Sequence, residues 1–369
     1  MLALEHRDRV RRIRLRISVS MEKVVVLMDG EFPMLEYLCV GPSHNMWFPF
    51  PKTFQAPQLR HLISFKSTCP IGSRLLSSAA MRLVTLSLVN IPPATHVQPD
   101  ELLDRVSLMP QLEILWIELD RFFSEHYSNL GVTDMQNAPH VSLPNLRFFQ
   151  FGGFTAYSEA FFSHIVAPHL EVVRIISWEE QTFSVPYLLQ FMNTSRYLGL
   201  RLGSATLSFN IVGAALSIYP HRTVKPSVFE MLIEGSPGYK VSNAAQILNP
   251  LRPLFSPVVD LALKCEINRP SPELEFETQS TYWRMLLRSF DNVKTVFVAN
   301  GVIEKLSRSL RFDDGEFPDD LLSELKELAY SPSNDNVDAF ADFINTRRNA
   351  GLLVTLVRLK DNSLLSHGP

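Results

Sequence analysis

The chain of 369 residues lacks the features that mark secreted and membrane-spanning proteins. It has three cysteines, Cys39, Cys69 and Cys265, which are far apart and odd in number, so no disulfide framework is expected. No run approaches the roughly 20 apolar residues that span a bilayer, and charges occupy the amino-terminal stretch where a signal peptide needs apolar residues. We therefore expect a protein of the cytoplasm or nucleus without membrane contact.

The short motifs that carry catalytic chemistry are also missing. There is no Gly-x-Gly-x-x-Gly, no phosphate-binding loop of the Walker type, no Gly-x-Ser-x-Gly and no His-Glu-x-x-His. The ten histidines include no i, i+4 pair of the kind that binds a metal on a helix. Carboxylate pairs such as Asp313-Asp314 are more typical of solvated connections than of acid/base sites. We expect no enzymatic activity, no metal and no cofactor.

The chain also has no excess of basic over acidic residues: its formal net charge is -3, and charged residues make up only 20% of it. The one basic run, residues 7–17, has the alternation of a strand, clearest from Arg12 to Ile17. This alternation predicts a strand whose Arg12, Arg14 and Arg16 face solvent while Ile13 and Leu15 face a core. A nuclear-import or nucleic-acid patch is the alternative interpretation of the run. Because no chain-wide basic surface supports it, we expect no nucleic-acid partner.

What the chain does have is a recurring pattern, Pro-x-Leu-x-x-Leu-x-Leu. It is clearest in Pro33–Val40, Pro110–Ile117, Pro144–Phe151 and Pro168–Ile175. Its apolar triplet continues at the same offsets, with first positions at residues 10, 35, 59, 83, 112, 146, 170, 197, 228, 258, 293, 325 and 354. The spacing of 24 to 35 residues overlaps the roughly 20 to 29 residues of a leucine-rich repeat and requires insertions in the longer units.

Between the strands the apolar spacing becomes helical. Such segments are residues 99–108, 159–165, 185–192, 281–290 and 319–325, and several are followed by a proline that ends the helix. A unit of this kind cannot bury its own apolar face, so neighbouring units must stack. The expected fold is α/β: a leucine-rich-repeat solenoid, with a curved parallel sheet and helices on its outer face. We expect a single array over residues 1–369, with a kink or subdivision near residues 269–272.

The units at Pro110, Pro144 and Pro168, the helix Glu101–Val106 and the closing segment Phe340–Gly351 resemble the leucine-rich-repeat portion of fungal F-box proteins, particularly those of mushroom-forming fungi. The resemblance covers nearly the whole chain. It implies that the repeats hold a substrate protein for a ubiquitin ligase. In that family an amino-terminal F-box binds the adaptor Skp1. Because we detect no F-box before residue 10, Skp1 is an expected partner only if an F-box lies upstream.

The pattern also predicts a binding face. Side chains alternate along a strand, so the third and fifth positions of each template project from the exposed side of the sheet. The candidate partner-binding residues are Tyr37, His61, Ile114, Trp116, Phe148, Arg174 and Arg201. Exposed aromatic side chains beside arginine are typical of binding hot spots. A covering loop, or a register shifted by one residue, would remove this face.

The function expected is therefore a protein-interaction module of the substrate-receptor type. A free-standing leucine-rich-repeat scaffold without a ligase connection is the main alternative. An enzyme on another repetitive α/β fold is a more remote one.

Overall fold

The computed structural model describes residues 6–17, 21–42, 47–68, 73–92, 98–120, 138–178, 185–195, 202–210, 212–220, 227–234, 240–265, 277–311, 321–331 and 338–359. The chain divides into two compact units. Residues 1–174 and 190–197 form the first unit, and residues 175–189 and 198–369 form the second. Each unit is built on a mostly parallel β-sheet accompanied by helices, as the α/β class requires.

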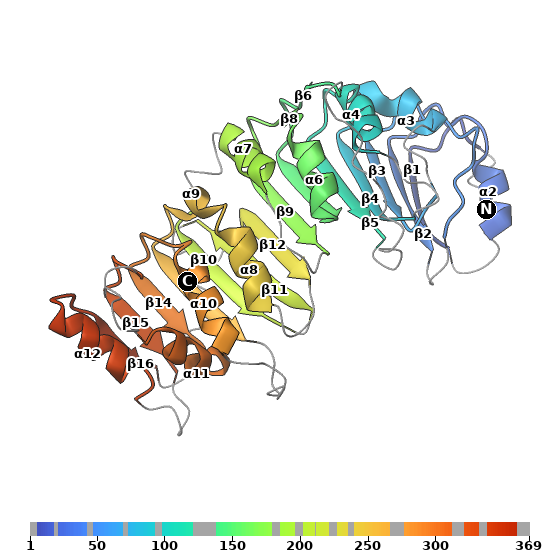
Figure 1. The fold of residues 1–369 in the computed structure, drawn as a ribbon. Helices are drawn as coiled ribbons and strands as arrows, with labels where there is room; N and C mark the ends of the chain where they lie inside the picture. The colour runs from blue at the N-terminus through green and yellow to red at the C-terminus, as the bar shows by residue number, and fades with distance from the viewer. Residues whose placement is uncertain are drawn as a thin grey trace. The chain divides into compact units, whose positions relative to one another are not determined.

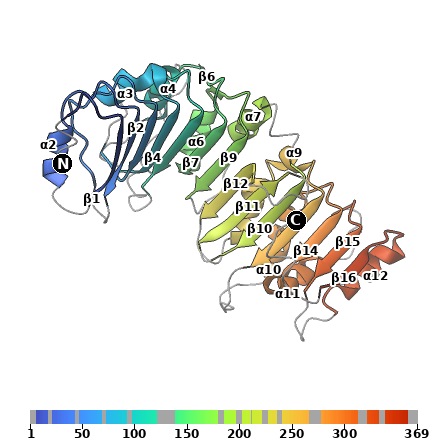
Figure 2. The ribbon, with the colours of Figure 1, turned by 180° about the vertical axis from the view of Figure 1, so that it is seen from behind.

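In the first unit the strands follow one another in the order β1-β2-β3-β4-β5-β7-β9, with helices on one side (Figures 1 and 2). Its main elements are β1 (Arg12–Ile17), α2 (Met21–Met28), β2 (Tyr37–Pro42), β3 (His61–Phe65), α3 (Arg74–Ala79), η1 (Ala80–Arg82), β4 (Thr85–Ile91), α4 (Pro99–Ser107), β5 (Ile114–Leu119), β7 (Phe148–Gly153), α6 (Thr155–Phe162), β9 (Val172–Ser177) and α7 (Pro186–Thr194). A separate two-stranded sheet pairs β6 (Val141–Ser142) with β8 (Ile165–Val166). β9 and α7 straddle the division between the units.

One local geometry recurs before the strands. In many of the templates the first apolar residue donates its backbone N–H to the carbonyl three residues earlier, as in Leu35 to Phe32 (3.2 Å) and Leu112 to Met109 (3.2 Å). The next two backbone N–H groups then donate to one carbonyl that lies just before the neighbouring strand. Glu113 and Ile114, for example, both donate to Val84, at 2.8 and 3.1 Å. The turn therefore satisfies backbone hydrogen-bonding groups within itself and also bonds to the segment before the neighbouring strand, which holds the two strands side by side.

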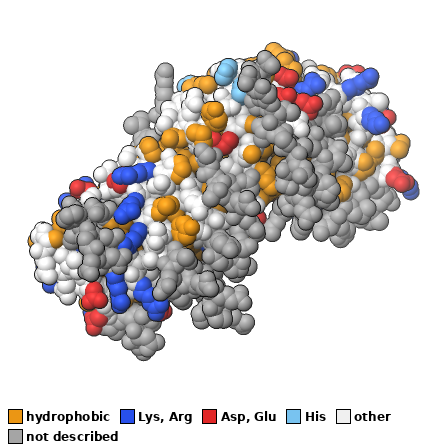
Figure 3. Space-filling view, in the orientation of Figure 1, with side chains coloured by type: hydrophobic (Ala, Val, Ile, Leu, Met, Phe, Trp, Pro, Cys, Tyr) orange, Lys and Arg blue, Asp and Glu red, His pale blue; other side chains and the backbone are white. Residues whose placement is uncertain are grey.

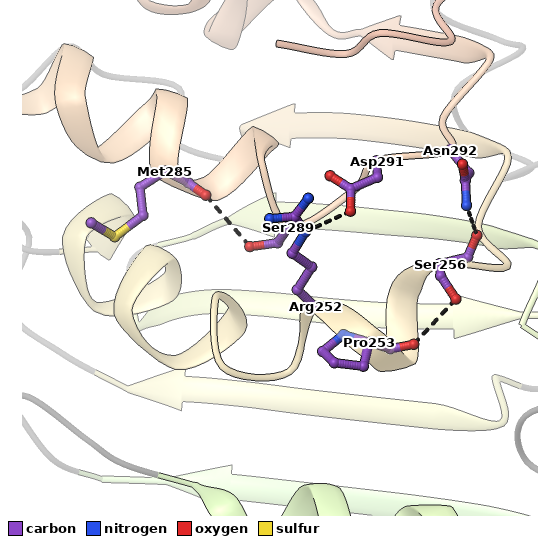
Figure 4. Close-up of polar contacts among 7 residues, drawn as sticks. All are labelled: Arg252, Pro253, Ser256, Met285, Ser289, Asp291 and Asn292. Carbon is purple, nitrogen blue, oxygen red and sulfur yellow. Dashed lines mark hydrogen bonds and ion pairs between the residues drawn. The ribbon is translucent and has the colours of Figure 1, made fainter. Parts of the chain in front are cut away.

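Asparagine side chains reinforce two of these turns, at equivalent positions in the two units. The amide of Asn145 donates to the carbonyl of Pro110 at 2.9 Å, and that of Asn292 donates to the carbonyl of Ser256 at 2.8 Å. Each asparagine precedes the first apolar residue of its template. Figure 4 shows the second case, beside the ion pair between Arg252 Nε and Asp291 Oδ2 at 2.5 Å. The same side chain therefore links adjacent repeats in both halves of the chain.

The predicted inward positions form the core of the first unit. The fourth template positions align across the strands and are fully buried; they are Leu38, Leu62, Leu86, Leu115 and Phe149. Ser64, which interrupts the apolar pattern in β3, is also buried, and its hydroxyl bonds to that of Ser67. This bond removes the cost of a polar group in the core. The buried neighbouring segments 112–117, 146–151 and 170–175 confirm the predicted strand order in this region.

The second unit has the strand order β12-β11-β10-β13-β14-β15-β16. Its elements are β10 (Ser204–Phe209), β11 (Gly213–Tyr219), β12 (Phe229–Glu234), α8 (Lys240–Leu248), α9 (Arg252–Phe255), β13 (Asp260–Cys265), α10 (Glu277–Leu287), β14 (Thr295–Val298), α11 (Asn300–Ser309), β15 (Glu327–Tyr330), α12 (Ala341–Asn349) and β16 (Thr355–Arg358). The pairs from β10 through β13 to β16 are parallel.

The expectation of an entirely parallel sheet is wrong in this unit. β11 runs antiparallel to both β10 and β12. The reversal begins at Asn210, whose side-chain oxygen accepts from the N–H groups of Val212 (2.9 Å) and Gly213 (3.0 Å). A Cβ on Gly213 would lie 1.9 Å from the carbonyl oxygen of Ile233, so the approach of β12 requires glycine there. A tight hairpin replaces the helical connection that a parallel neighbour would need.

Three further local predictions are corrected. The triplet assigned to Tyr197, Leu200 and Leu202 does not match the described strand: Tyr197 and Leu200 lie outside the described residues, and the buried triplet of β10, which begins at Ser204, is Leu202, Ala205 and Leu207. In β16 Leu356, not Val357, aligns with the buried Leu328, so the register there is shifted by one residue.

The third correction concerns the predicted helix at residues 319–325. Residues 321–324 form a turn, with Leu322 at a φ of 53°. The predicted kink at residues 269–272 lies outside the described residues.

Candidate binding face of the first unit

The parallel register of the first unit aligns one side chain from each strand in a row across the sheet. The row consists of Arg12, Tyr37, His61, Thr85, Ile114 and Phe148. These residues occupy the third template position, opposite the buried fourth position, so they lie on the side of the sheet away from the core. Ile114 is the most exposed of the four candidate residues in this row, at 37%. Tyr37, His61 and Phe148 are half-buried.

Contacts run along this row. The Arg12 guanidinium lies 5.0 Å from the centroid of the Tyr37 ring, a cation–π distance. The Tyr37 and His61 rings are 6.1 Å apart, and His61 Nδ1 lies 3.1 Å from Thr85 Oγ1. The side chains thus support one another and present a preorganised surface, which lowers the entropic cost of binding.

A second row lies next to the first and contains Arg14, Cys39, Ile63, Ser87, Trp116 and Gln150. Ser87 and Gln150 are buried, whereas Trp116 is half-buried. The Trp116 indole N–H donates to Glu118 Oε2 at 3.3 Å. Trp116 is therefore held in place by a residue of its own strand.

The structure brings most of the predicted site residues together. Ile114 lies opposite Phe148 on adjacent strands, while Trp116 lies opposite Gln150. The guanidinium of Arg174 lies 5.4 Å from the centroid of the Phe148 ring. Arg201 lies outside the described residues, so its part in the face stays a prediction.

Electrostatics on this face favour a neutral histidine. Burial lowers the pKa of His61 from its usual value, and the positive charges of Arg60 and Arg12 lower it further, in that order; Glu113 opposes the shift. A neutral ring beside the Thr85 hydroxyl fits a half-buried contact surface, because no charge has to be desolvated when a partner covers it.

A groove at the carboxyl ends of the first strands was not anticipated. It has a volume of about 580 Å³ and is lined by Arg14, Leu15, Arg16, Cys39, Val40, Gly41, Pro42, Phe65, Lys66 and Asn90. From the sequence, the arginines of β1 are expected to be solvent-facing residues of an alternating strand, with a nuclear-import or nucleic-acid patch as the alternative. Nothing in the sequence alone showed that Lys66 and Phe65, some 50 residues later, complete a concavity with them.

The second unit contains a different kind of buried charge. Lys240 is 6% exposed, and its amine donates to the carbonyl of Asn210 at the β10–β11 hairpin. Burial lowers the pKa of Lys240; Cys265 opposes this shift and Lys305 adds to it. The side chain ties α8 to the hairpin, a structural role.

The chain was compared with known proteins and searched for metal clusters and membrane-spanning helices. No protein-family model matches the chain, and no curated protein or solved structure is significantly similar to it. Across the ranges that the structure describes, no cluster of three or more His, Cys, Asp or Glu is arranged to hold a metal ion. Within the same ranges, no helix is both long and apolar enough to cross a membrane.

Proposed function

We propose that this chain is a leucine-rich-repeat solenoid that binds a protein partner on the exposed sheet face of its first unit. The recurring turn and the shared carbonyl before successive strands support a repeat of this kind, since the same local structure is built from each copy of the sequence pattern. The asparagine bonds to the preceding turn, at Asn145 and Asn292, support it in both units.

The observation that carries the binding function is the aligned row from Arg12 to Phe148. Aromatic and aliphatic side chains from adjacent strands lie side by side there, with Arg174 stacked on Phe148. Tyrosine, tryptophan and arginine are the residues most enriched at the energetic centre of protein interfaces. A half-buried, mutually packed row of this composition is better suited to a protein surface than to a small molecule, which needs a concave site.

The resemblance to fungal F-box proteins makes the role more specific. We infer that the repeats hold the substrate of a ubiquitin ligase, with Skp1 recruited only through an F-box. Residues 1–369 alone should then fail to retain purified Skp1. Robust retention would show a docking segment within the repeats and would contradict this assignment of roles.

A photo-crosslinking amino acid placed at Trp116 tests the face. The protein would be incubated with a lysate of a mushroom-forming fungus, and its crosslinked products compared with those from the same amino acid at Met81. Met81 is 68% exposed, belongs to the first unit and lies outside the two rows. We expect discrete protein adducts from position 116. The additional substitution Phe148→Ala, on the adjacent strand, should abolish them. Equal labelling from positions 116 and 81 would contradict a specific face.

A further inference from the structure

The groove at the carboxyl ends of β1–β4 has the size and the charge of a ligand site. Its volume of about 580 Å³ lies within the roughly 300 to 1,000 Å³ typical of ligand pockets. Three of its lining residues, Arg14, Arg16 and Lys66, are basic, and none is acidic. We propose that this groove binds an acidic, Asp/Glu-rich segment of a protein partner. This inference rests on the proposed function, because Arg14 and Arg16 project from the same side of β1 as Arg12 of the aligned row.

The two arginines are available to a ligand. Arg14 and Arg16 are two residues apart on β1, so both side chains project from the same side of the sheet, and both are exposed. Within the described ranges neither makes an ion pair. Their positive charges repel one another until a carboxylate approaches, and a guanidinium can hold a carboxylate through two parallel hydrogen bonds.

Two other arginines of this unit, Arg11 and Arg147, differ in this respect. Arg11 lies 3.7 Å from Glu36, and Arg147 lies 3.5 Å from Glu171. Each of these surface charges already has a carboxylate from its own chain. The contrast singles out Arg14 and Arg16, two neighbouring arginines of the groove that have no carboxylate partner among the described residues.

Basic side chains also gather on the second unit, as Figure 3 shows. Three arginines of this unit have internal partners. Arg252 pairs with Asp291 at 2.5 Å, and Arg308 pairs with Glu304 one turn earlier in α11. Arg284 donates from Nε to the carbonyl of Ser309 at 2.8 Å. These interactions give the three arginines a structural role, so the three do not indicate a ligand.

The groove also has an apolar wall. Phe65 is 38% exposed and lies over Gly41, where an added Cβ would be only 3.0 Å from the Phe65 Cβ. Glycine at this position therefore allows the close approach of Phe65 on β3 to β2. A fitting segment places carboxylates against Arg14 and Arg16 and an apolar side chain against Phe65.

A protein segment fits better than a nucleic acid. A nucleic acid is an extended polyanion that needs a continuous basic surface, whereas here three cations converge in one groove on a chain of net charge -3. The test nevertheless includes a single-stranded DNA oligonucleotide as a competitor.

The experiment is a selection from a random 12-residue peptide display library on the immobilised full chain. Selected peptides are then labelled with fluorescein and their Kd values measured by anisotropy. The variant Arg14→Gln/Arg16→Gln removes both charges, Arg14→Lys/Arg16→Lys keeps them, and Arg82→Gln is a control at an exposed arginine of η1. Circular dichroism and thermal melting check the fold of each variant.

We expect the selected peptides to be enriched in Asp and Glu, with an apolar residue among them. The double glutamine variant should weaken their binding at least tenfold, the double lysine variant less than that, and Arg82→Gln not at all. Higher NaCl should also weaken binding. No selected peptides, no acidic enrichment, unchanged affinity in the double glutamine variant, or tighter binding of the oligonucleotide would each overturn the proposal.

Trp116→Ala separates this inference from the proposed function. Trp116→Ala could weaken the binding of the selected peptides while the double glutamine variant leaves it unchanged. The proposal that the face binds protein would then stand, and the proposal that the groove binds an acidic segment would be wrong. If neither variant changes binding, both the groove and the face are wrong.

Discussion

His61 Nδ1 lies 3.1 Å from Thr85 Oγ1, across two adjacent strands of the first unit. The two residues occupy the same template position and pair in register on β3 and β4, so the parallel register of these strands brings them into contact. The pKa of His61 is lowered because burial and the charges of Arg60 and Arg12 disfavour the imidazolium. The imidazole of His61 that contacts the Thr85 hydroxyl is therefore the neutral form.

This shift predicts a pH dependence of stability. The unfolded chain gains a proton on His61 near its ordinary pKa of about 6.5, while the folded chain gains it only at lower pH. The contribution is therefore fully present above pH 6.5 and is lost as the pH falls below it. We expect His61→Gln to reduce the decline in unfolding free energy between pH 7.5 and 5, measured by urea denaturation. His169→Gln is the control, and an identical decline in the His61 variant and the wild type would contradict the predicted coupling.

The second prediction concerns the buried fourth template positions. Leu115 is fully buried on β5, and Leu115→Ala should destabilise the first unit by about 2 to 5 kcal/mol, since it removes apolar contacts and leaves a cavity. Chemical denaturation measures this change. Met81→Ala, at a residue that is 68% exposed, should change stability by less than about 0.5 kcal/mol. Similar effects of the two substitutions would argue against the assigned core.

The asparagine links between turns predict small, parallel effects in the two units. Asn145→Ala and Asn292→Ala each remove one hydrogen bond to a backbone carbonyl, so each should cost about 1 kcal/mol. Hydrogen exchange of the amides in the preceding turn would locate the loss. Asn345→Ala, on the exposed side of α12, should be neutral or slightly stabilising because alanine has the higher helix propensity. An equal loss at Asn345 would show that the links contribute nothing specific.

Arg347 makes a fourth prediction, in the second unit. It is completely buried in α12 and donates to the carbonyls of Leu321 (2.9 Å) and Ser323 (3.3 Å). Arg347→Met would leave these carbonyls without their donor, at a cost of about 2 kcal/mol or more, measured as a fall in the denaturation midpoint. Arg348→Met, at an exposed position of the same helix, is the matched control. A neutral Arg347→Met would mean that the buried guanidinium contributes no net stability.

Much of the first unit could be predicted from sequence because its organisation is local. Each template residue such as Leu112 closes a turn with the residue three positions earlier and begins a strand whose side chains alternate. The positions of Leu115 and Ile117 in the core, and of Ile114 and Trp116 on the other side, follow from that alternation. The same reasoning failed at Leu202, because the small Ala205 made the true triplet look weaker than the one five residues before it.

In the first unit the sequence by itself thus determined which residues are the buried apolar residues of the strands and on which side of each strand they lie. Only the tertiary structure decided strand direction in β11, because alternation is identical in parallel and antiparallel strands and the deciding contact is the approach of Ile233 to Gly213. The tertiary structure also decided that Arg14 and Arg16 share a groove with Phe65 and Lys66. Residues so far apart in the chain meet only when repeats stack, and no local pattern specifies how their side chains then converge.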